Sequence, residues 1–141
     1  MPTDAADFAE ALIAGAPDAV IFTDADGTIT RWHTGATRMF GYAAAEAIGS
    51  SLDLIIPDTL RARQWQGYRE TMRTGQTRYG DGQILAVPAL RKDGSRLPVE
   101  FTIVPFLDPE GRMCGIGAIL RDVTTRFEEM RALRKQVAAR G

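Results

Sequence analysis

The sequence has few of the residue types that build covalent or metal-based sites. Its 141 residues include one cysteine, Cys114, and one histidine, His33. A single cysteine excludes an internal disulfide framework and a cysteine-based metal cluster, and it fits a reducing compartment. No apolar run approaches the roughly 18 residues of a membrane span, and the acidic N-terminus lacks a signal-peptide pattern. We therefore expect a cytoplasmic protein without direct membrane contact.

The chain also lacks a strong excess of either charge. Its net charge is -1, lysine occurs only as Lys92 and Lys135, and the arginines from Arg31 to Arg140 form no basic block. Such a balance creates no field that attracts nucleic acid or anionic lipid, so neither is an expected partner. The contents of apolar (45%) and charged (25%) residues are ordinary for a globular protein, and the length suggests one domain.

The stretch Val20–Ile29 supports two opposite interpretations. Its Asp24-x-Asp26-Gly27-Thr28 pattern resembles the nucleophile loop of haloacid-dehalogenase-type phosphatases, in which two carboxylates and Mg²⁺ carry out phosphoryl transfer. The same letters predict a β-hairpin with an Asp-Gly turn. Such a phosphatase also needs a lysine and an acidic pair at the ends of parallel strands, and no Asp-Asp pair follows a later strand. We therefore favour the hairpin and expect Asp24 to bond backbone groups near the turn.

Hydrophobic periodicity changes along the chain from helical to strand-like and back. Alternating apolar residues and turn sequences predict strands over Ala19–Thr23, Thr28–Trp32, Ile84–Leu90, Arg96–Phe106 and Met113–Leu120. Apolar residues three and four apart predict helices over Asp4–Ala14, Thr34–Phe40, Ala43–Ile48, Thr59–Arg73 and from Asp122 onward. Asp58 is expected to cap the long central helix and Gly75 to end it.

These elements predict an α+β fold. Hairpins such as Lys92-Asp93-Gly94 connect the last three strands, which makes the sheet antiparallel. The expected architecture is a five-stranded antiparallel sheet with short helices packed on one face and an amphipathic helix at each terminus. We divide the chain into an N-terminal helix over residues 1–16, a core over residues 17–121 and a C-terminal helix over residues 122–141. Because the sequence ends within that helix, we expect it to be a piece of a longer protein.

Five short motifs occur in the order and at the spacing of one known family. They are Phe22–Ile29, Trp32-His33, Met39–Tyr42 with Glu46–Gly49, Arg91–Ser95 and Arg121–Thr124. Together they resemble the PAS domain with its C-terminal PAC segment, over about Phe8 to Thr125. His33 departs from the family pattern, which usually has an asparagine there that bonds backbone groups of the following helix. A histidine can supply such a bond through one ring nitrogen, so His33 is expected to be a capping residue.

The resemblance implies a sensory module of a bacterial-type signalling protein, without enzymatic activity of its own. PAS domains bind a small molecule, a cofactor or a partner in a pocket between the central helix and the sheet. They usually dimerise and act through terminal helices on an effector domain in a longer chain. A homodimer is therefore expected here, with a small apolar or aromatic ligand as the matching occupant of the pocket. Two alternatives stay open: a constitutive dimerisation module without a ligand, and a Mg²⁺-dependent phosphatase that uses Asp24 and Asp26.

The candidate site residues form three groups. The expected walls of the ligand pocket are Ile55, Leu60, Gln64, Tyr68, Leu85, Val99, Phe101, Ile103 and Ile116. Gln64 and the Tyr68 hydroxyl are the polar groups that can orient a ligand there. The start of the C-terminal helix is expected to relay a signal through Asp122, Val123 and Thr124. The apolar stripes of the terminal helices need a partner, and the expected dimer interface consists of Phe8, Leu12, Phe127, Met130, Leu133 and Val137.

Two cofactors known from this family do not match the sequence. Haem-binding PAS domains use a histidine on the central helix, whereas Gln64 occupies about that position here, and an amide oxygen is a poor ligand for haem iron. Blue-light flavin domains carry a cysteine before that helix, whereas the residues there are Leu52–Pro57. Cys114 lies on the last strand, where a small buried core residue is expected. Haem and covalent flavin photochemistry are therefore not expected, while a non-covalently bound flavin against Trp65 or Gln64 stays open.

Overall fold

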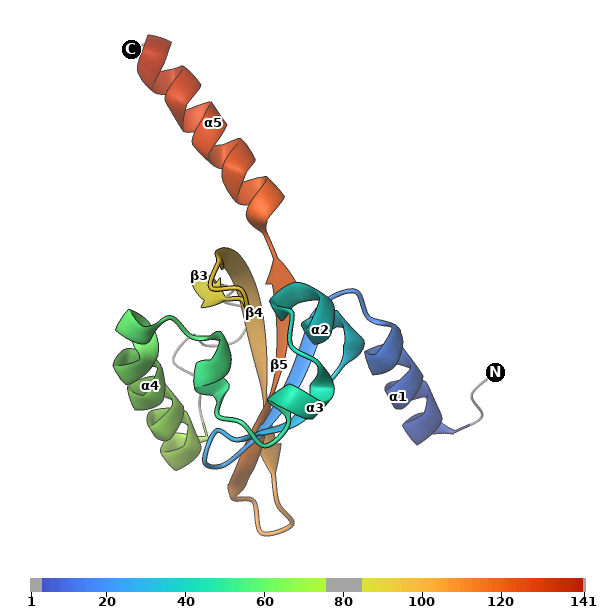
Figure 1. Ribbon diagram of the computed structural model, residues 1–141. Helices are drawn as coiled ribbons and strands as arrows, with labels where there is room; N and C mark the ends of the chain where they lie inside the picture. The colour runs from blue at the N-terminus through green and yellow to red at the C-terminus, as the bar shows by residue number, and fades with distance from the viewer. Residues whose placement is uncertain (1–3, 76–84, 141) are drawn as a thin grey trace.

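The central element of the fold is a sheet of five strands. The computed structural model describes residues 4–75 and 85–140 of the chain. The strands are β1 (Ala19–Asp24), β2 (Ile29–Trp32), β3 (Leu85–Leu90), β4 (Arg96–Leu107) and β5 (Met113–Asp122). They lie in the order β2-β1-β5-β4-β3, and every neighbouring pair is antiparallel (Figure 1). The predicted five-stranded antiparallel sheet is confirmed.

Helices cover one face of this sheet and extend from both ends of the chain. Between β2 and β3 lie α2 (Thr34–Phe40), α3 (Ala44–Ala47), the 3₁₀ helices η1 (Leu52–Ile55) and η2 (Asp58–Leu60), and α4 (Arg61–Thr74). The terminal helices are α1 (Ala5–Gly15) and α5 (Thr124–Arg140). Figure 1 shows α5 projecting away from the rest of the domain. The two predicted terminal helices are confirmed, and in the described ranges no helix has the length and apolar character needed to span a membrane.

The Asp24–Thr28 stretch is a hairpin turn between β1 and β2. The Oδ1 atom of Asp24 accepts hydrogen bonds from the backbone N–H groups of Asp26 at 2.9 Å and Thr28 at 3.0 Å. Gly27 has a φ of 81°, in the left-handed region that favours glycine, and its N–H donates to the Asp24 carbonyl. The Asp24 side chain thus holds the turn together, as predicted. Among the described residues, no three His, Cys, Asp or Glu side chains are grouped so that they could hold a metal ion.

The prediction that Asp58 caps the central helix is wrong. Asp58 begins η2, whereas α4 begins at Arg61 with Leu60 as its N-cap residue. The Asp58 carboxylate lies 2.7 Å from the Arg61 guanidinium, so a neighbouring arginine takes the carboxylate that the pattern assigned to the cap. The other end of the helix is as predicted, since Gly75 follows α4 in the left-handed conformation with a φ of 73°.

Alternate strand residues and one face of the helices form the core. Its largest fully buried apolar side chains include Phe40, Ile21, Ile29, Leu97 and Val99. Burying a side chain of this size stabilises the fold by roughly 1.5–3 kcal/mol. The buried Trp32 adds polar bonds to this packing, because its indole N–H donates to the Tyr42 carbonyl at 3.0 Å and to the Thr37 hydroxyl at 3.1 Å. These contacts tie β2 to the helices that follow it.

Cys114 lies outside this core, contrary to the prediction. Its side chain is exposed near the start of β5. The register of the β4–β5 pair shifts between Phe106, which lies opposite Gly115, and Leu107, which lies opposite Met113. Cys114 is therefore the extra residue of a β-bulge. Strand alternation alone puts Cys114 on the same face as the buried Ile116, and the bulge breaks that alternation.

Gly35, at the start of α2, lies so close to the backbone of Asp18 that a side chain at this position should destabilise the fold. A Cβ atom there would lie 2.1 Å from the carbonyl oxygen of Asp18. We expect Gly35→Ala to lower the free energy of unfolding by about 1–3 kcal/mol in urea denaturation. Gly67→Ala is the control, because a Cβ on this residue of α4 has open space around it and alanine favours helix by about 1 kcal/mol. A Gly35→Ala variant as stable as the wild type would contradict the contact.

Candidate functional site

A cavity of about 360 Å³ lies between α4 and the face of the sheet that the helices cover. Eight of the nine predicted wall residues line it, namely Ile55, Leu60, Gln64, Tyr68, Val99, Phe101, Ile103 and Ile116. The ninth is Leu85, which pairs with Phe101 through the backbone of β3, but its side chain lies outside the described part of the chain. The sequence therefore located the walls of the cavity, and ligand binding by these residues stays a prediction.

Sequence reasoning missed three polar residues of the lining, Thr23, Arg63 and Thr71. Thr23 follows the buried Ile21 by two positions in β1, so strand alternation could have found it. Thr71 lies one turn after Tyr68 in α4, so the helical period could have found it as well. Arg63 lies at the edge of this helix face, and no sequence pattern indicates that its side chain reaches the cavity.

The Tyr68 hydroxyl joins α4 to the sheet beside the cavity. It donates a hydrogen bond to the backbone carbonyl of Asp24 and lies 2.9 Å from the Thr23 hydroxyl. The Thr23 hydroxyl is also 3.5 Å from the Ile116 carbonyl in β5. Two buried hydroxyl groups thus find their partners inside the protein, which offsets the cost of removing them from water.

The environment of Tyr68 keeps its phenol neutral. Burial raises the pKa of the Tyr68 phenol above its ordinary value. The hydrogen bond with Thr23 acts in the opposite direction, and the negative charges of Asp24 and Asp26 raise the pKa further. The hydroxyl therefore remains a donor to the Asp24 carbonyl at neutral and moderately alkaline pH.

Trp65 fixes the position of α4 relative to the hairpin and η1. Its indole N–H donates to the Asp53 carboxylate at 2.6 Å, and its ring meets the Tyr68 ring edge-on with centroids 5.4 Å apart. A Cβ atom on Gly27 would lie 2.1 Å from the indole, so the ring lies directly against the hairpin turn. Trp65 therefore packs against the hairpin, whereas Gln64 is the neighbour that lines the cavity.

The residues that line the cavity do not fit haem iron or a covalent flavin. Gln64 is in the lining, whereas His33 precedes α2 and Cys114 is on the β5 bulge. In the described part of the wall there is thus neither an imidazole for iron nor a thiol for a flavin adduct.

His33 occupies the predicted N-cap position of α2, but its side chain does not make the predicted capping hydrogen bond. The N-terminus of α2 has no side-chain cap hydrogen bond. The Nε2 atom of His33 lies 3.7 Å from the Glu10 carboxylate of α1, and Arg31 lies 3.3 Å from the same carboxylate. The Nδ1 atom is buried and finds no hydrogen-bond partner among the described residues. The imidazole therefore faces Glu10 of the N-terminal helix and makes no hydrogen bond with the backbone of α2.

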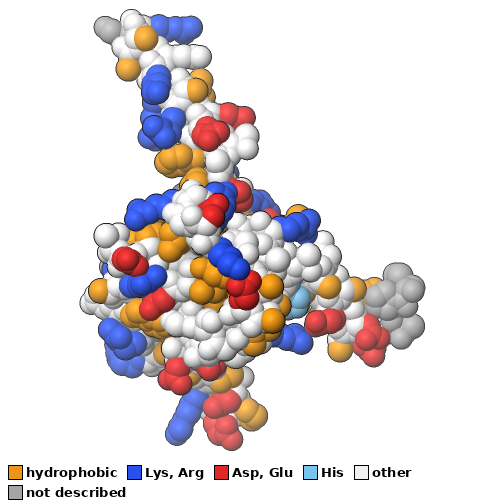
Figure 2. All heavy atoms as spheres, in the orientation of Figure 1, with side chains coloured by type: hydrophobic (Ala, Val, Ile, Leu, Met, Phe, Trp, Pro, Cys, Tyr) orange, Lys and Arg blue, Asp and Glu red, His pale blue; other side chains and the backbone are white. Residues whose placement is uncertain are grey.

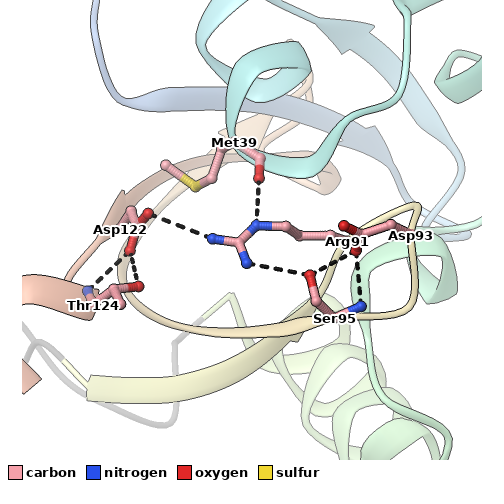
Figure 3. A network of polar contacts seen from close by, with 6 residues as sticks. All are labelled: Met39, Arg91, Asp93, Ser95, Asp122 and Thr124. Carbon is pink, nitrogen blue, oxygen red and sulfur yellow. Dashed lines mark hydrogen bonds and ion pairs between the residues drawn. The ribbon is translucent and has the colours of Figure 1, made fainter. Parts of the chain in front are cut away.

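The predicted relay residues lie where β5 ends and α5 begins. The Oδ1 atom of Asp122 accepts hydrogen bonds from the Thr124 N–H at 2.9 Å and from the Thr124 hydroxyl at 2.5 Å (Figure 3). Val123 is buried, and its N–H donates to the Pro98 carbonyl of β4 at 3.1 Å. The first turn of α5 is therefore attached both to the end of β5 and to the neighbouring strand.

Arg91 joins this junction to two other parts of the domain (Figure 3). Its guanidinium lies 3.8 Å from the Oδ2 atom of Asp122, and its Nε donates to the Met39 carbonyl of α2 at 3.4 Å. It also donates to the Ser95 hydroxyl at 3.2 Å, and Ser95 in turn bonds the Asp93 carboxylate in the β3–β4 turn. One side chain thus contacts α2, the β3–β4 turn and the end of β5, where the chain enters α5. The sequence identified Arg91 only as part of a turn motif.

The predicted dimer residues are exposed on the terminal helices. Neither α1 nor α5 has a buried residue. The exposed apolar side chains are Phe8, Leu12, Phe127, Met130, Leu133 and Val137. Figure 2 shows hydrophobic, basic and acidic side chains interspersed along the projecting α5. An ion pair between Arg126 and Glu100 of β4 holds the base of α5, and pairing with a second copy stays a prediction.

The raised pKa of Tyr68 predicts a loss of stability at alkaline pH. Because the phenol titrates near 10 in the unfolded chain and higher in the folded one, its contribution is fully present below pH 10 and is lost as pH rises through the folded-state pKa. We expect Tyr68→Phe to lower stability by about 1–3 kcal/mol at neutral pH and to reduce the loss above pH 10.

Urea denaturation at neutral pH and between about pH 9 and 11 measures both effects. Tyr42→Phe is the matched control, because it removes a phenol that is outside the lining of the cavity. If stability falls with pH in the same way in the wild type, Tyr68→Phe and Tyr42→Phe, the Tyr68 hydroxyl does not have the role that we assign to it.

Comparison with known proteins agrees with the fold. The family model described as PAS fold matches residues 14–128. The sensor protein FixL of Bradyrhizobium diazoefficiens is 33% identical over 87 residues, which are 62% of this chain and 17% of FixL. The oxygen sensor protein DosP of Escherichia coli is 26% identical over 104 residues, which are 74% of this chain and 13% of DosP. The chain therefore spans less than a fifth of the length of these relatives.

A solved structure gives the same result for the backbone. The crystal structure of the PAS domain of a protein from Colwellia psychrerythraea superposes with a TM-score of 0.75 at 23% sequence identity. The match covers 86% of this chain and 99% of that one, and at this identity it concerns the fold alone. With a family model that matches most of its length, and with the five-stranded sheet and helices described above, this chain belongs to the PAS fold family.

Proposed function

We propose that this PAS domain is the ligand-binding module of a larger signalling protein. A small apolar or aromatic molecule binds in the cavity between α4 and the sheet, and α5 passes the event to an effector domain elsewhere in that protein. The observation that carries the proposal is the cavity itself, whose many aliphatic walls and few polar groups are typical of small-molecule sites. The relatives FixL and DosP are both named as sensors.

Shared elements support a path from the cavity to α5. Val99 lines the cavity and lies opposite Asp122 in the β4–β5 pair. Arg91 follows β3, whose residues Val87–Ala89 also line the cavity. At 3.8 Å the ion pair between Arg91 and Asp122 has room to shorten, so a small displacement of β3 changes it. A ligand that binds one arrangement of these groups more tightly than another shifts the population toward it.

The exposed apolar residues of the terminal helices support a homodimer. A helix of 17 residues is marginally stable in water on its own, and α5 has no buried residue. Pairing with α5 of a second copy covers Phe127, Met130, Leu133 and Val137. The effector domain is then joined to a two-helix stem. The proposal includes a cytoplasmic location, which the free and exposed thiol of Cys114 supports.

The alternative is a dimerisation module whose cavity has no physiological ligand. It uses the same helices, so the occupancy of the cavity distinguishes the two functions. No observation favours the Mg²⁺-dependent phosphatase, because the Asp24 carboxylate is bonded to the turn and the described residues contain no candidate metal site.

Native mass spectrometry of the purified chain tests occupancy and subunit count together. We expect a dimer that carries an additional small mass. Gly67→Phe is expected to remove that mass, because Gly67 lines the cavity and has open space beside it for a ring. Gln66→Phe is the matched control, since Gln66 is exposed on the same helix and should leave the mass in place. A dimer without any bound mass would favour the constitutive module.

The relay predicts a local effect of Arg91→Gln. Loss of the ion pair with Asp122 should raise hydrogen exchange of the amides at residues 124–127 by up to about fivefold, because a partly exposed pair of this kind contributes about 0–1 kcal/mol. Arg96→Gln is the control, since Arg96 is an exposed arginine at the start of β4. Hydrogen exchange monitored by mass spectrometry measures the effect. Unchanged protection in Arg91→Gln would show that this contact does not hold the start of α5.

A further inference from the structure

We propose that the ligand of this cavity is a small organic acid, with an apolar body and one carboxylate group that pairs with Arg63. This inference rests on the proposed function, because it takes the cavity as the ligand site, and it adds the chemical class of the ligand. Arg63 is the one charged side chain among the described residues of the lining. Its side chain is exposed and also lines the cavity, so it stands at the opening.

The hydroxyl groups beside β1 are not available to a ligand carboxylate. The hydrogen of the Tyr68 hydroxyl goes to the Asp24 carbonyl. The Thr23 hydroxyl then has its hydrogen directed at the Tyr68 oxygen, 2.9 Å away, or at the Ile116 carbonyl, 3.5 Å away. A carboxylate placed here would meet oxygen lone pairs without a donor, which is unfavourable in a buried site. This part of the cavity therefore suits the apolar body of a ligand.

Apart from the Thr71 hydroxyl, which is in the last turn of α4, the donors that remain in the described lining lie near the start of this helix. Gln64 supplies an amide N–H₂ group and Arg63 a guanidinium, whose fork of N–H groups matches the two oxygens of a carboxylate. Arg63 precedes Tyr68 by five residues, or about 7.5 Å along the helix axis. A ligand that places its carboxylate at Arg63 can thus extend its apolar body toward Tyr68.

Among the described residues, no carboxylate near the start of α4 pairs with Arg63. Asp58 pairs with Arg61 at 2.7 Å, and Asp53 accepts the Trp65 indole N–H at 2.6 Å. Arg63 has no ion pair with any residue in the described part of the chain. The cation is thus left for an anionic ligand group. The same arrangement disfavours amines and amino acids, because the described lining holds no carboxylate to pair with an ammonium group.

Matched pairs of acids and amides test this class. Isothermal titration calorimetry at low salt compares phenylacetate with phenylacetamide, and hexanoate with hexanamide, on the full chain. We expect each acid to bind about tenfold or more tightly than its amide, as charge-assisted hydrogen bonds imply. Arg63→Gln should remove this preference. Arg69→Gln is the matched control, because Arg69 is exposed on the same helix outside the lining, and this variant should retain the preference.

The outcomes separate this inference from the proposed function. If the amides bind as tightly as the acids, if Arg63→Gln keeps the preference, or if neither acid binds at millimolar concentration, the acid class is wrong. The cavity can still be a ligand site in those cases. A small mass that native mass spectrometry finds on the wild type but not on Gly67→Phe would show that it is. If, in addition, no mass is bound to the wild type or the same mass stays bound to Gly67→Phe, the proposed function fails as well.

Discussion

The antiparallel pairing of β1 with β5 holds the first and the last strand of the domain together. It runs from Ala19 opposite Leu120 to Asp24 opposite Gly115, and it brings the first hairpin against the last strand. The approach is close, because a Cβ atom on Gly115 would lie 2.4 Å from the Thr23 carbonyl. This pairing puts residues from both ends of the domain into one cavity wall. It also fixes where the chain leaves the sheet to begin α5.

The polar side chains of the domain have two separate tasks. Tyr68 and Asp122 are bonded within the protein: Tyr68 joins α4 to the sheet, and Asp122 joins the end of β5 to the first residue of α5. Arg63 and Gln64 lie at the cavity without such a linking role and are available to a bound molecule. The core itself is almost entirely apolar, so it provides volume and stability but little directional information. In the proposed function, recognition and transmission therefore depend on a few polar groups around that core.

Local patterns in the sequence were sufficient for the sheet, the helices and most of the cavity wall. Strand alternation places Val99, and the helical period places Tyr68, on the face that lines the cavity. The Asp-Gly sequence of the first hairpin is sufficient to predict the turn that Asp24 stabilises. The errors arose where an interaction or a change of register that the pattern does not include altered the expected arrangement. Arg61 takes the carboxylate of Asp58, and a bulge in the β4–β5 pair turns Cys114 outward.

Contacts between distant segments were the part that the sequence could not supply. Arg91 contacts Met39 of α2 and Asp122 at the end of β5, and both residues are far from Arg91 in the sequence. The folded sheet brings these segments together, and no local period or motif predicts which residues then meet. His33 is a similar case, since a carboxylate from α1 lies beside its ring. Arg63 lines the cavity from α4, and a bond between Trp65 and Asp53 of η1, which no local pattern predicts, helps to hold this helix in place.

The connection between β5 and α5 has a consequence for the proteins that contain this domain. A single residue, Val123, separates the two elements, and it is buried. The last strand therefore sets the rotational phase of the helix, with no flexible linker to absorb a change. Each residue added within α5 turns whatever follows by about 100°, and about seven residues restore the original phase. Under the proposed function, natural or engineered fusions that keep signalling intact should therefore differ in the length of this helical stem by steps of about seven residues.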